Sequence, residues 1–141
     1  DELLRAADVV FPLAPGSAET ENLIGKTELA AMRRGALLIN VSRGELLDEA
    51  AVAEALRSGH LGGLGLAVGR AADQRPSPEL AALPGVVATP HLGGLTPENA
   101  DAQAASSVEQ VAAMVAGEIP PRSLNAERAT RLRALWNRTL R

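Results

Sequence analysis

LLINVSRGELLDE, residues 37–49, is the stretch that decides the fold of this chain. Residues 36–41 (ALLINV) are almost continuously apolar, which is typical of a short strand covered on both faces of a parallel sheet. A Ser-Arg-Gly turn follows at residues 42–44, and Asp48 stands where it can cap a helix. The stretch therefore predicts a buried strand, an exposed turn and a helix in direct succession.

This order of elements puts an arginine at the carboxyl end of a central strand. Open α/β sheets bind their ligands at that edge. The guanidinium of Arg43 suits a carboxylate or a phosphate, which it can hold by two parallel hydrogen bonds. The alternative is an ordinary surface arginine after a strand, and the spacing alone does not separate the two.

A second turn of the same kind follows another apolar run. Residues 86–89 (VVAT) are followed by a Pro-His-x-Gly-Gly turn that contains His91. A single histidine after a strand is more often structural than catalytic. However, Arg43 and His91 are predicted at the same edge of one sheet, and each is followed by glycine, which lets a ligand approach the backbone closely. The pair therefore indicates a binding or catalytic site.

Three segments of the chain resemble the NAD-dependent D-isomer-specific 2-hydroxyacid dehydrogenase family, which includes D-lactate, glyoxylate/hydroxypyruvate and D-3-phosphoglycerate dehydrogenases. They are ADVVFPLAPGSAETENLIG, MRRGALLINVSRGELLDEAAVAEALRSGHLGGLGLAV and VVATPHLGGLTPE. The similarity runs from Glu2 to about Gly69 and from about Pro84 to Asn125. It implies an oxidoreductase that transfers a hydride between NAD or NADP and a small 2-hydroxy or 2-oxo acid, and that forms a homodimer.

The resemblance also implies roles for particular residues. Arg43 matches the family arginine that holds the substrate carboxylate and polarises the carbonyl. His91 matches the acid/base histidine, which exchanges a proton with the substrate hydroxyl. The positions that contact the cofactor in the family fall on Pro15, Val41, Ser42, Arg43, Ala67, His91, Gly93 and Gly94.

Two residues depart from the family pattern. Ala67 replaces an aspartate near the nicotinamide, and Ala72 replaces the glutamate that hydrogen-bonds the histidine. A carboxylate beside an imidazole fixes its tautomer and favours its protonated form, so its loss weakens the acid/base site. Asp73 could serve instead after a one-residue slip, or be a solvated loop residue. Arg70, in the same loop, could face a cofactor phosphate or substrate, or simply solvent.

These losses leave a second class of function open. The chain could be a non-catalytic relative that acts as an interaction or assembly module, which the alanines at positions 67 and 72 favour. Retention of Arg43, His91 and both glycine turns favours an enzyme.

The length of 141 residues fits one domain, whereas the family enzyme is about twice as long. No GxGxxG turn occurs, and residues 62–65 (GGLG) have neither its spacing nor its setting. The pyrophosphate-binding turn is therefore expected before Asp1. The fold class is α/β, the second half of a Rossmann-like doubly wound parallel sheet with C-terminal helices. We assign residues 1–125 to this partial NAD(P)-binding domain and 126–141 to a helix that packs on a substrate domain.

The predicted elements alternate along the chain. The Asp8–Phe11 strand is expected at an edge of the sheet, Thr27 as a helix cap, and Thr96 and Pro97 as a strong helix start. The expected helices are 2–7, 28–33, 49–56, 97–116 and 126–138, the strands are 8–11, 36–41, 63–68 and 86–89, and the loop is 70–84.

Composition restricts the class of partner. The net charge is −3 and the basic residues are scattered, so no nucleic-acid footprint is predicted. The arginines near the end suit a solvated helix face or a contact with a partner. Cysteines are absent, which excludes disulfides and cysteine-based metal sites. No leader or membrane-spanning run is found, which favours a cytoplasmic protein. His60, Glu45 and Glu98 are expected to be loop, turn and helix-start residues.

Overall fold

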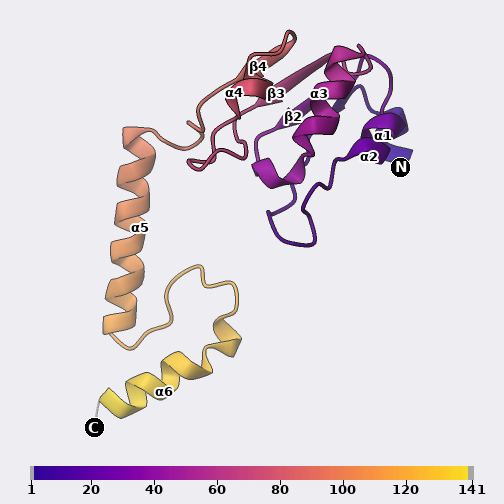
Figure 1. The fold of residues 1–141 in the computed structure, drawn as a ribbon. Coiled ribbons are helices and arrows are strands. Elements are labelled where there is room, and N and C mark those ends of the chain that lie inside the picture. The colour runs from indigo at the N-terminus through magenta and orange to yellow at the C-terminus, as the bar shows by residue number, and fades with distance from the viewer. Residues whose placement is uncertain (1, 140–141) are drawn as a thin grey trace. The chain divides into compact units, whose positions relative to one another are not determined.

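The computed structural model describes residues 2–139, which belong to two compact units (Figure 1). The sheet unit ends at Gly93, and the helical unit begins at Gly94. The sheet unit contains α1 (Glu2–Ala6), β1 (Val9–Val10), α2 (Lys26–Ala31), β2 (Leu37–Asn40), the 3-10 helix η1 (Gly44–Leu46), α3 (Glu49–Arg57), β3 (Gly63–Leu66), α4 (Pro78–Ala81) and β4 (Val86–Ala88). The helical unit contains α5 (Pro97–Val115), the 3-10 helix η2 (Ala126–Arg128) and α6 (Thr130–Thr139).

The strands of the sheet unit form one parallel sheet. Among the described residues the sheet has four strands in the order β1-β2-β3-β4, and every neighbouring pair is parallel. The predicted α/β class is therefore confirmed, and β1 lies at an edge as expected. Because each crossover joins adjacent parallel strands in the same direction, the right-handed rule places α2, α3 and α4 on one face of the sheet. Figure 1 shows α2 and α3 together in front of the strands.

The hydrophobic core lies between the sheet and these helices. Leu38 and Leu64 from the strands are 0% and 3% exposed, and Leu29 and Val52 from α2 and α3 are 2% and 0% exposed. Strand residues alternate between the two faces of a sheet, so every second side chain of β1, β2 and β3 contributes to this core.

The opposite face of the sheet is open, which corrects the prediction that residues 36–41 are covered on both faces. Val9, Leu37 and Val87 project from it and are 42%, 40% and 72% exposed. The physical reason is the sequential strand order, which places every connecting helix of the unit on the same side.

Two of the predicted helix caps are confirmed. The carboxylate of Asp48 accepts a hydrogen bond from the backbone N–H of Ala51 at 3.0 Å, at the start of α3. The hydroxyl of Thr96 accepts one from the N–H of Asn99 at 3.2 Å, and Pro97 occupies the first turn of α5.

The predicted cap at Thr27 is wrong. Helix α2 begins at Lys26, two residues before the predicted start at residue 28, and Gly25 is its N-cap residue. The carboxylate of Glu28 reaches back and accepts the N–H of Gly25 at 3.0 Å, so this glutamate satisfies the free donor at the helix start.

The segment 70–84 also differs from the prediction of a continuous loop. It contains the short helix α4, with Pro78 in the first turn and Leu80 buried at 3% exposure. One buried leucine anchors the helix to the core, a signal too local for periodicity to detect. The last predicted helix, residues 126–138, is divided into η2 and α6.

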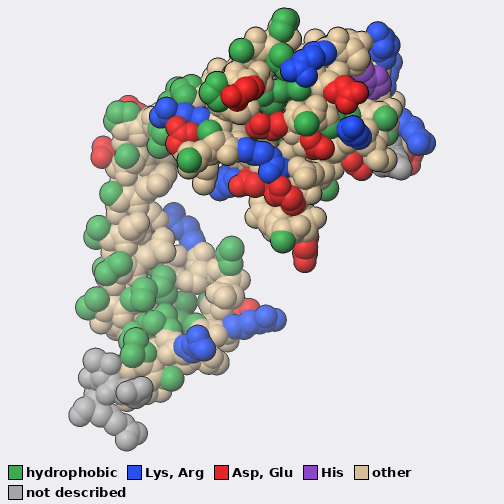
Figure 2. Space-filling view, in the orientation of Figure 1, with side chains coloured by type: hydrophobic (Ala, Val, Ile, Leu, Met, Phe, Trp, Pro, Cys, Tyr) green, Lys and Arg blue, Asp and Glu red, His purple; other side chains and the backbone are tan. Residues whose placement is uncertain are grey.

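The helical unit exposes much of its apolar surface. An apolar stripe that includes Val108, Val111 and Val115 runs along α5. No residue of that helix is buried, and these three are 68%, 58% and 84% exposed. Figure 2 shows hydrophobic side chains along this helix. The guanidinium of Arg122 lies 2.8 Å from the carboxylate of Glu109 and ties the following loop back to α5. The unit boundary after Gly93 lies earlier in the chain than the predicted domain boundary after residue 125.

Candidate functional site at the carboxyl edge of the sheet

The strands β2, β3 and β4 end level with one another at the carboxyl edge. The N–H of Ala67 donates to the carbonyl of Asn40 at 3.0 Å, and the N–H of Thr89 donates to the carbonyl of Leu66 at 2.8 Å. These bonds continue the ladder one step beyond the strands. The Ser-Arg-Gly turn and the Pro-His turn therefore leave the sheet at the same edge, as the sequence predicted.

Asn40 anchors the turn that carries Arg43. Its side chain is 0% exposed, Nδ2 donates to the carbonyl of Arg43 at 2.7 Å, and Oδ1 accepts the N–H of Ser42 at 3.1 Å. The hydroxyl of Ser42 donates to the carbonyl of Ala14 at 2.8 Å, which ties the turn to the loop that contains Pro15. Sequence reasoning missed this role of Asn40, although a lone amide inside an apolar strand was the available signal.

The side chain of Arg43 is exposed at this edge. Its Nη1 donates to the carbonyl of Ser42 at 2.8 Å, and no ion pair involves Arg43 within residues 2–139. A Cβ built on Gly16 would lie 3.2 Å from Arg43 Cγ, so the aliphatic stem passes close over this glycine. The remaining guanidinium donors are available to an anionic group.

Gly44 lies directly against the loop that follows β3. A Cβ at Gly44 would lie 2.2 Å from the carbonyl carbon and oxygen of Gly69, a separation that real atoms do not adopt. Glycine is therefore required after Arg43 because two backbone segments meet there.

His91 adopts an uncommon backbone conformation. Its φ is +55°, which non-glycine residues seldom adopt, and its N–H donates to the carbonyl of Thr89 at 2.9 Å. The residue is half-buried, and its imidazole makes no hydrogen bond or ion pair with the described part of the chain. Gly93 follows in an open position, where an added Cβ would meet nothing within 4 Å.

Asp73 does not replace the missing glutamate. Its carboxylate lies 3.1 Å from Nε of Arg75 and accepts the N–H of the same arginine at 3.1 Å. The carboxylate of Asp73 therefore pairs with Arg75 and not with His91. Ala72, where the family has the glutamate, is exposed.

Arg70 makes contacts within the protein that neither sequence-based interpretation included. Its guanidinium lies 2.7 Å from the carboxylate of Glu21 and donates to backbone carbonyls of the segment after Arg43. Its guanidinium is thus held by contacts within the protein, although the side chain remains 31% exposed. Glu45 lies in η1 and is exposed, as expected for a turn residue.

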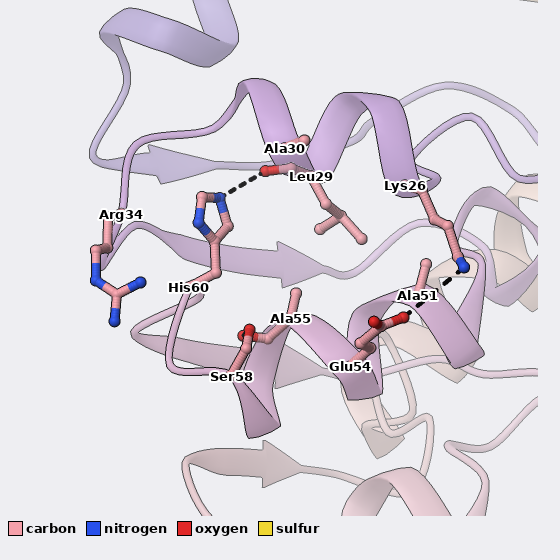
Figure 3. A pocket seen from close by; sticks show the side chains of 9 residues that line it. All are labelled: Lys26, Leu29, Ala30, Arg34, Ala51, Glu54, Ala55, Ser58 and His60. Carbon is pink, nitrogen blue, oxygen red and sulfur yellow. Dashed lines mark hydrogen bonds and ion pairs between the residues drawn. The ribbon is translucent and has the colours of Figure 1, made fainter.

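His60 lies in a groove between α2 and α3, outside the predicted site (Figure 3). The groove has a volume of about 450 Å³, and none of the predicted site residues lines it. Nε2 of His60 lies 2.8 Å from the carbonyl oxygen of Leu29, so the half-buried imidazole links α2 to the loop after α3. His60 is a loop residue as predicted, but it is not simply solvated. Lys26 and Glu54 also line this groove, and Nζ of Lys26 lies 3.8 Å from Oε2 of Glu54.

The described residues hold no group of three or more histidine, cysteine or acidic side chains that could bind a metal. No helix within residues 2–139 combines the length and the apolar character needed to cross a membrane. On the visible face, Lys and Arg side chains are interspersed with Asp and Glu (Figure 2).

A parallel sheet with glycine-containing turns at its carboxyl edge is typical of nucleotide-binding α/β domains. Residues 1–93 match the family model of the D-isomer specific 2-hydroxyacid dehydrogenase, NAD binding domain. The chain therefore belongs to the D-isomer specific 2-hydroxyacid dehydrogenase family, and the sequence-based assignment is confirmed.

Known proteins of this family resemble the chain over most of its length. D-3-phosphoglycerate dehydrogenase of Mycobacterium leprae is 40% identical over 127 residues, which are 90% of this chain and 24% of that protein. The chain thus spans about a quarter of the length of this relative.

Two solved structures show the same fold. The TT0316 protein from Thermus thermophilus is 43% identical with a TM-score of 0.76, over 85% of this chain and 38% of that one. D-lactate dehydrogenase from Aquifex aeolicus, complexed with NAD and lactic acid, is 28% identical with a TM-score of 0.71, over 83% and 40%. The predicted Rossmann-like sheet is confirmed by these neighbours.

Proposed function

We propose that the protein containing this chain is an NAD(P)-dependent oxidoreductase that interconverts a small 2-hydroxy acid and its 2-oxo acid. The observation that carries the proposal is the emergence of Arg43 and His91 from one carboxyl edge, in a chain that belongs to this dehydrogenase family. A cation and an acid/base group at one edge are what the chemistry of a 2-oxo acid requires.

Arg43 holds the substrate in this proposal. A 2-oxo acid carries a carboxylate next to a carbonyl, and a planar guanidinium can bind the carboxylate by two hydrogen bonds. The same positive charge polarises the adjacent carbonyl, which makes its carbon a better hydride acceptor. The exposed guanidinium of Arg43, without an ion pair in residues 2–139, supports this role.

His91 moves the proton. During reduction, a hydride adds to the carbonyl carbon and a protonated imidazole gives its N–H proton to the carbonyl oxygen, which becomes the hydroxyl. In the reverse direction, the neutral imidazole accepts the hydroxyl proton while the hydride leaves the carbon. The ring of His91 has no hydrogen bond with the described residues, so it can meet a substrate oxygen without breaking an existing contact.

The residues at this edge fit the nicotinamide end of NAD or NADP, which supplies or accepts the hydride when bound. Val41 is exposed, Ala67 is half-buried, and Gly93 has open space around it, so that a flat ring can approach the backbone. Pro15, Ser42, Arg43, Ala67, His91 and Gly94 complete the proposed contacts. The 141 residues contain no GxGxxG turn for the pyrophosphate.

The alternative is a non-catalytic interaction or assembly module. This alternative is favoured because no carboxylate of the described residues pairs with the imidazole of His91, and Asp73 pairs with Arg75. The two functions differ in one measurable property, because only the enzyme oxidises or reduces a nicotinamide in the presence of a 2-oxo or 2-hydroxy acid.

A homodimer and a cytoplasmic location are part of the proposal. The open sheet face and the apolar stripe of α5 supply the surface that association requires, since Leu37, Val87 and Val111 are 40%, 72% and 58% exposed. Covering these residues would remove a large apolar area from water.

The experiment is a steady-state assay of the full-length protein with NADH and NADPH against a series of short 2-oxo acids. Arg43→Lys should mainly raise KM for the oxo acid, because an ammonium cannot reproduce the bidentate contact. His91→Asn should lower kcat by about 100- to 10,000-fold, the usual contribution of acid/base catalysis. Arg75→Ala is the matched control. Absence of nicotinamide turnover with every oxo acid would refute the proposal and favour the assembly module.

A further inference from the structure

Arg70 makes the densest set of polar contacts described for any side chain near the carboxyl edge. Its side chain is 31% exposed. Nε and Nη2 donate to the carbonyl of Leu47 at 3.1 and 3.0 Å, Nη2 also reaches the carbonyl of Glu45 at 2.8 Å and Oδ1 of Asn22 at 2.6 Å, and Nη1 reaches Oε1 of Glu21 at 2.7 Å.

These contacts join three segments that are distant in the sequence. Glu45 and Leu47 belong to the segment directly after Arg43, and Glu21 and Asn22 belong to the loop that follows the proposed cofactor contact at Pro15. Arg70 itself comes from the loop after β3. One guanidinium therefore connects the loop after β1, the turn after β2 and the loop after β3.

The backbone brings the same segments together around Arg70. The N–H of Asn22 donates to the carbonyl of Glu45 at 2.8 Å, and the N–H of Ile24 donates to the carbonyl of Leu46 at 2.9 Å. The N–H of Gly69 donates to the carbonyl of Gln74 at 2.9 Å, which closes the loop from which Arg70 projects. The guanidinium of Arg70 adds side-chain hydrogen bonds to the carbonyls of Glu45 and Leu47, where these backbone segments meet.

The junction also determines the backbone that presents Arg43. Arg43 is the N-cap residue of η1, and its carbonyl accepts the N–H of Leu46 at 3.3 Å. Asn40 bonds the carbonyl of Arg43 from the strand before the turn. Arg70 bonds the carbonyls of Glu45 and Leu47, which follow the turn. A planar guanidinium is suited to this task, because its donors have a fixed fork geometry.

We propose that Arg70 is a positioning residue that fixes the Ser-Arg-Gly turn, and with it the direction in which Arg43 meets the substrate carboxylate. This role rests on the proposed dehydrogenase function as far as the substrate is concerned. In this proposal Arg70 acts through the turn and not on the substrate, since each of its three nitrogens already donates within the protein.

The test uses the full-length protein and the variants Arg70→Ala, Arg70→Lys and Glu21→Gln. Arg75→Ala is the matched control, because this arginine lies in the same loop, is paired with Asp73 and makes no described contact with the turn. The readouts are KM for the 2-oxo acid, the affinity for NADH by fluorescence titration, and amide hydrogen exchange of residues 43–48.

Arg70→Ala should raise KM for the oxo acid by roughly 10- to 100-fold, since misplacing a substrate-holding group by about 1 Å costs up to this factor. Exchange in the turn should become faster. NADH affinity should fall less than the affinity for the oxo acid, because the turn supplies only part of the proposed cofactor contacts. Arg70→Lys should change both readouts in the same direction but less, because lysine keeps a cation without the fork. If Arg70→Ala does not fold, Arg70→Lys alone provides the test. Glu21→Gln, which keeps the guanidinium and its backbone bonds, should have the smallest effect.

The outcomes separate this inference from the proposed function. If Arg70→Ala and Arg70→Lys exchange in the turn as the wild type does, or if Arg75→Ala matches Arg70→Ala, the positioning role is overturned. If the wild type reduces no oxo acid while the turn of the Arg70 variants exchanges faster, the dehydrogenase proposal fails and the fixing of the turn by Arg70 stands.

Discussion

The side-chain amide of Asn40 lies 2.7 Å from the carbonyl oxygen of Arg43 and donates a hydrogen bond to it. This bond spans the turn between a strand and a helix, and Oδ1 of the same amide accepts the N–H of Ser42. A buried side chain therefore satisfies both polar groups of a turn whose arginine side chain remains exposed. The turn is thus bonded to a residue of the strand that precedes it.

Replacing this amide should weaken both the fold and the site. Asn40→Ala should lower the free energy of unfolding by about 1–3 kcal/mol, because two partly buried backbone groups lose their partner. Urea denaturation of the full-length protein measures this change. Asn40→Asp, which keeps the acceptor for Ser42 but loses the donor for Arg43, is the comparison. An alanine variant as stable as the wild type would contradict the anchoring role.

Gly44 and Gly93 should respond differently to alanine. At Gly44 a Cβ would lie 2.2 Å from the backbone of Gly69, so Gly44→Ala should destabilise by more than about 3 kcal/mol, the upper end of ordinary overpacking. At Gly93 nothing lies within 4 Å, so the free energy of unfolding should not change. If Gly93 faces the cofactor, Gly93→Ala should nevertheless weaken NADH binding. Equal melting temperatures for the two variants would disprove the steric account.

Restoring the missing carboxylate should improve catalysis. In an active full-length protein, Ala72→Glu should raise turnover and shift the pH profile of kcat/KM to higher pH, because a carboxylate stabilises the protonated imidazole of His91. Acid/base catalysis as a whole is worth about 100- to 10,000-fold, which sets the upper limit of the gain. Ala72→Gln is the neutral control. Unchanged kinetics in the folded glutamate variant would show that another group already serves His91.

The isolated chain should bind NADH weakly or not at all. Its 141 residues lack the GxGxxG turn that holds the pyrophosphate, and they supply only the proposed nicotinamide contacts. Titration calorimetry with the purified chain measures the affinity. Micromolar binding would mean that a phosphate site exists within these residues.

The isolated chain should also not remain a stable monomer. Val9 and Phe11 at the sheet edge are 42% and 53% exposed, and Val108 and Val115 on α5 are 68% and 84% exposed. Apolar surface and an unpaired edge strand favour dimers or exchanged elements. Light scattering combined with thermal unfolding tests this. A monomer with a single cooperative transition would show that the chain is self-sufficient.

The strand positions and the family could be predicted because both depend on local pattern. An apolar run followed by a polar turn predicted β2, and the same pattern predicted β4 and the edge at which Arg43 and His91 emerge. The cap at Thr27 was wrong because the helix begins after Gly25. The carboxylate of Glu28 accepts the N–H of Gly25, so no cap at Thr27 is needed. Helix α4 was missed because Leu80 is its one buried residue, and a single buried leucine produces no helical periodicity in the sequence.

The sequence by itself determined the order of the strands along the chain, the carboxyl edge and the family, since each follows from neighbouring residues. Only the tertiary structure decided which polar groups meet. Arg70 bonds Glu21 and Glu45, which are 49 and 25 residues away in the sequence, and Asp73 pairs with Arg75 instead of His91. Such partners depend on where loops fold back over the sheet edge and on how far each side chain reaches. Hydrophobic periodicity carries no information about either.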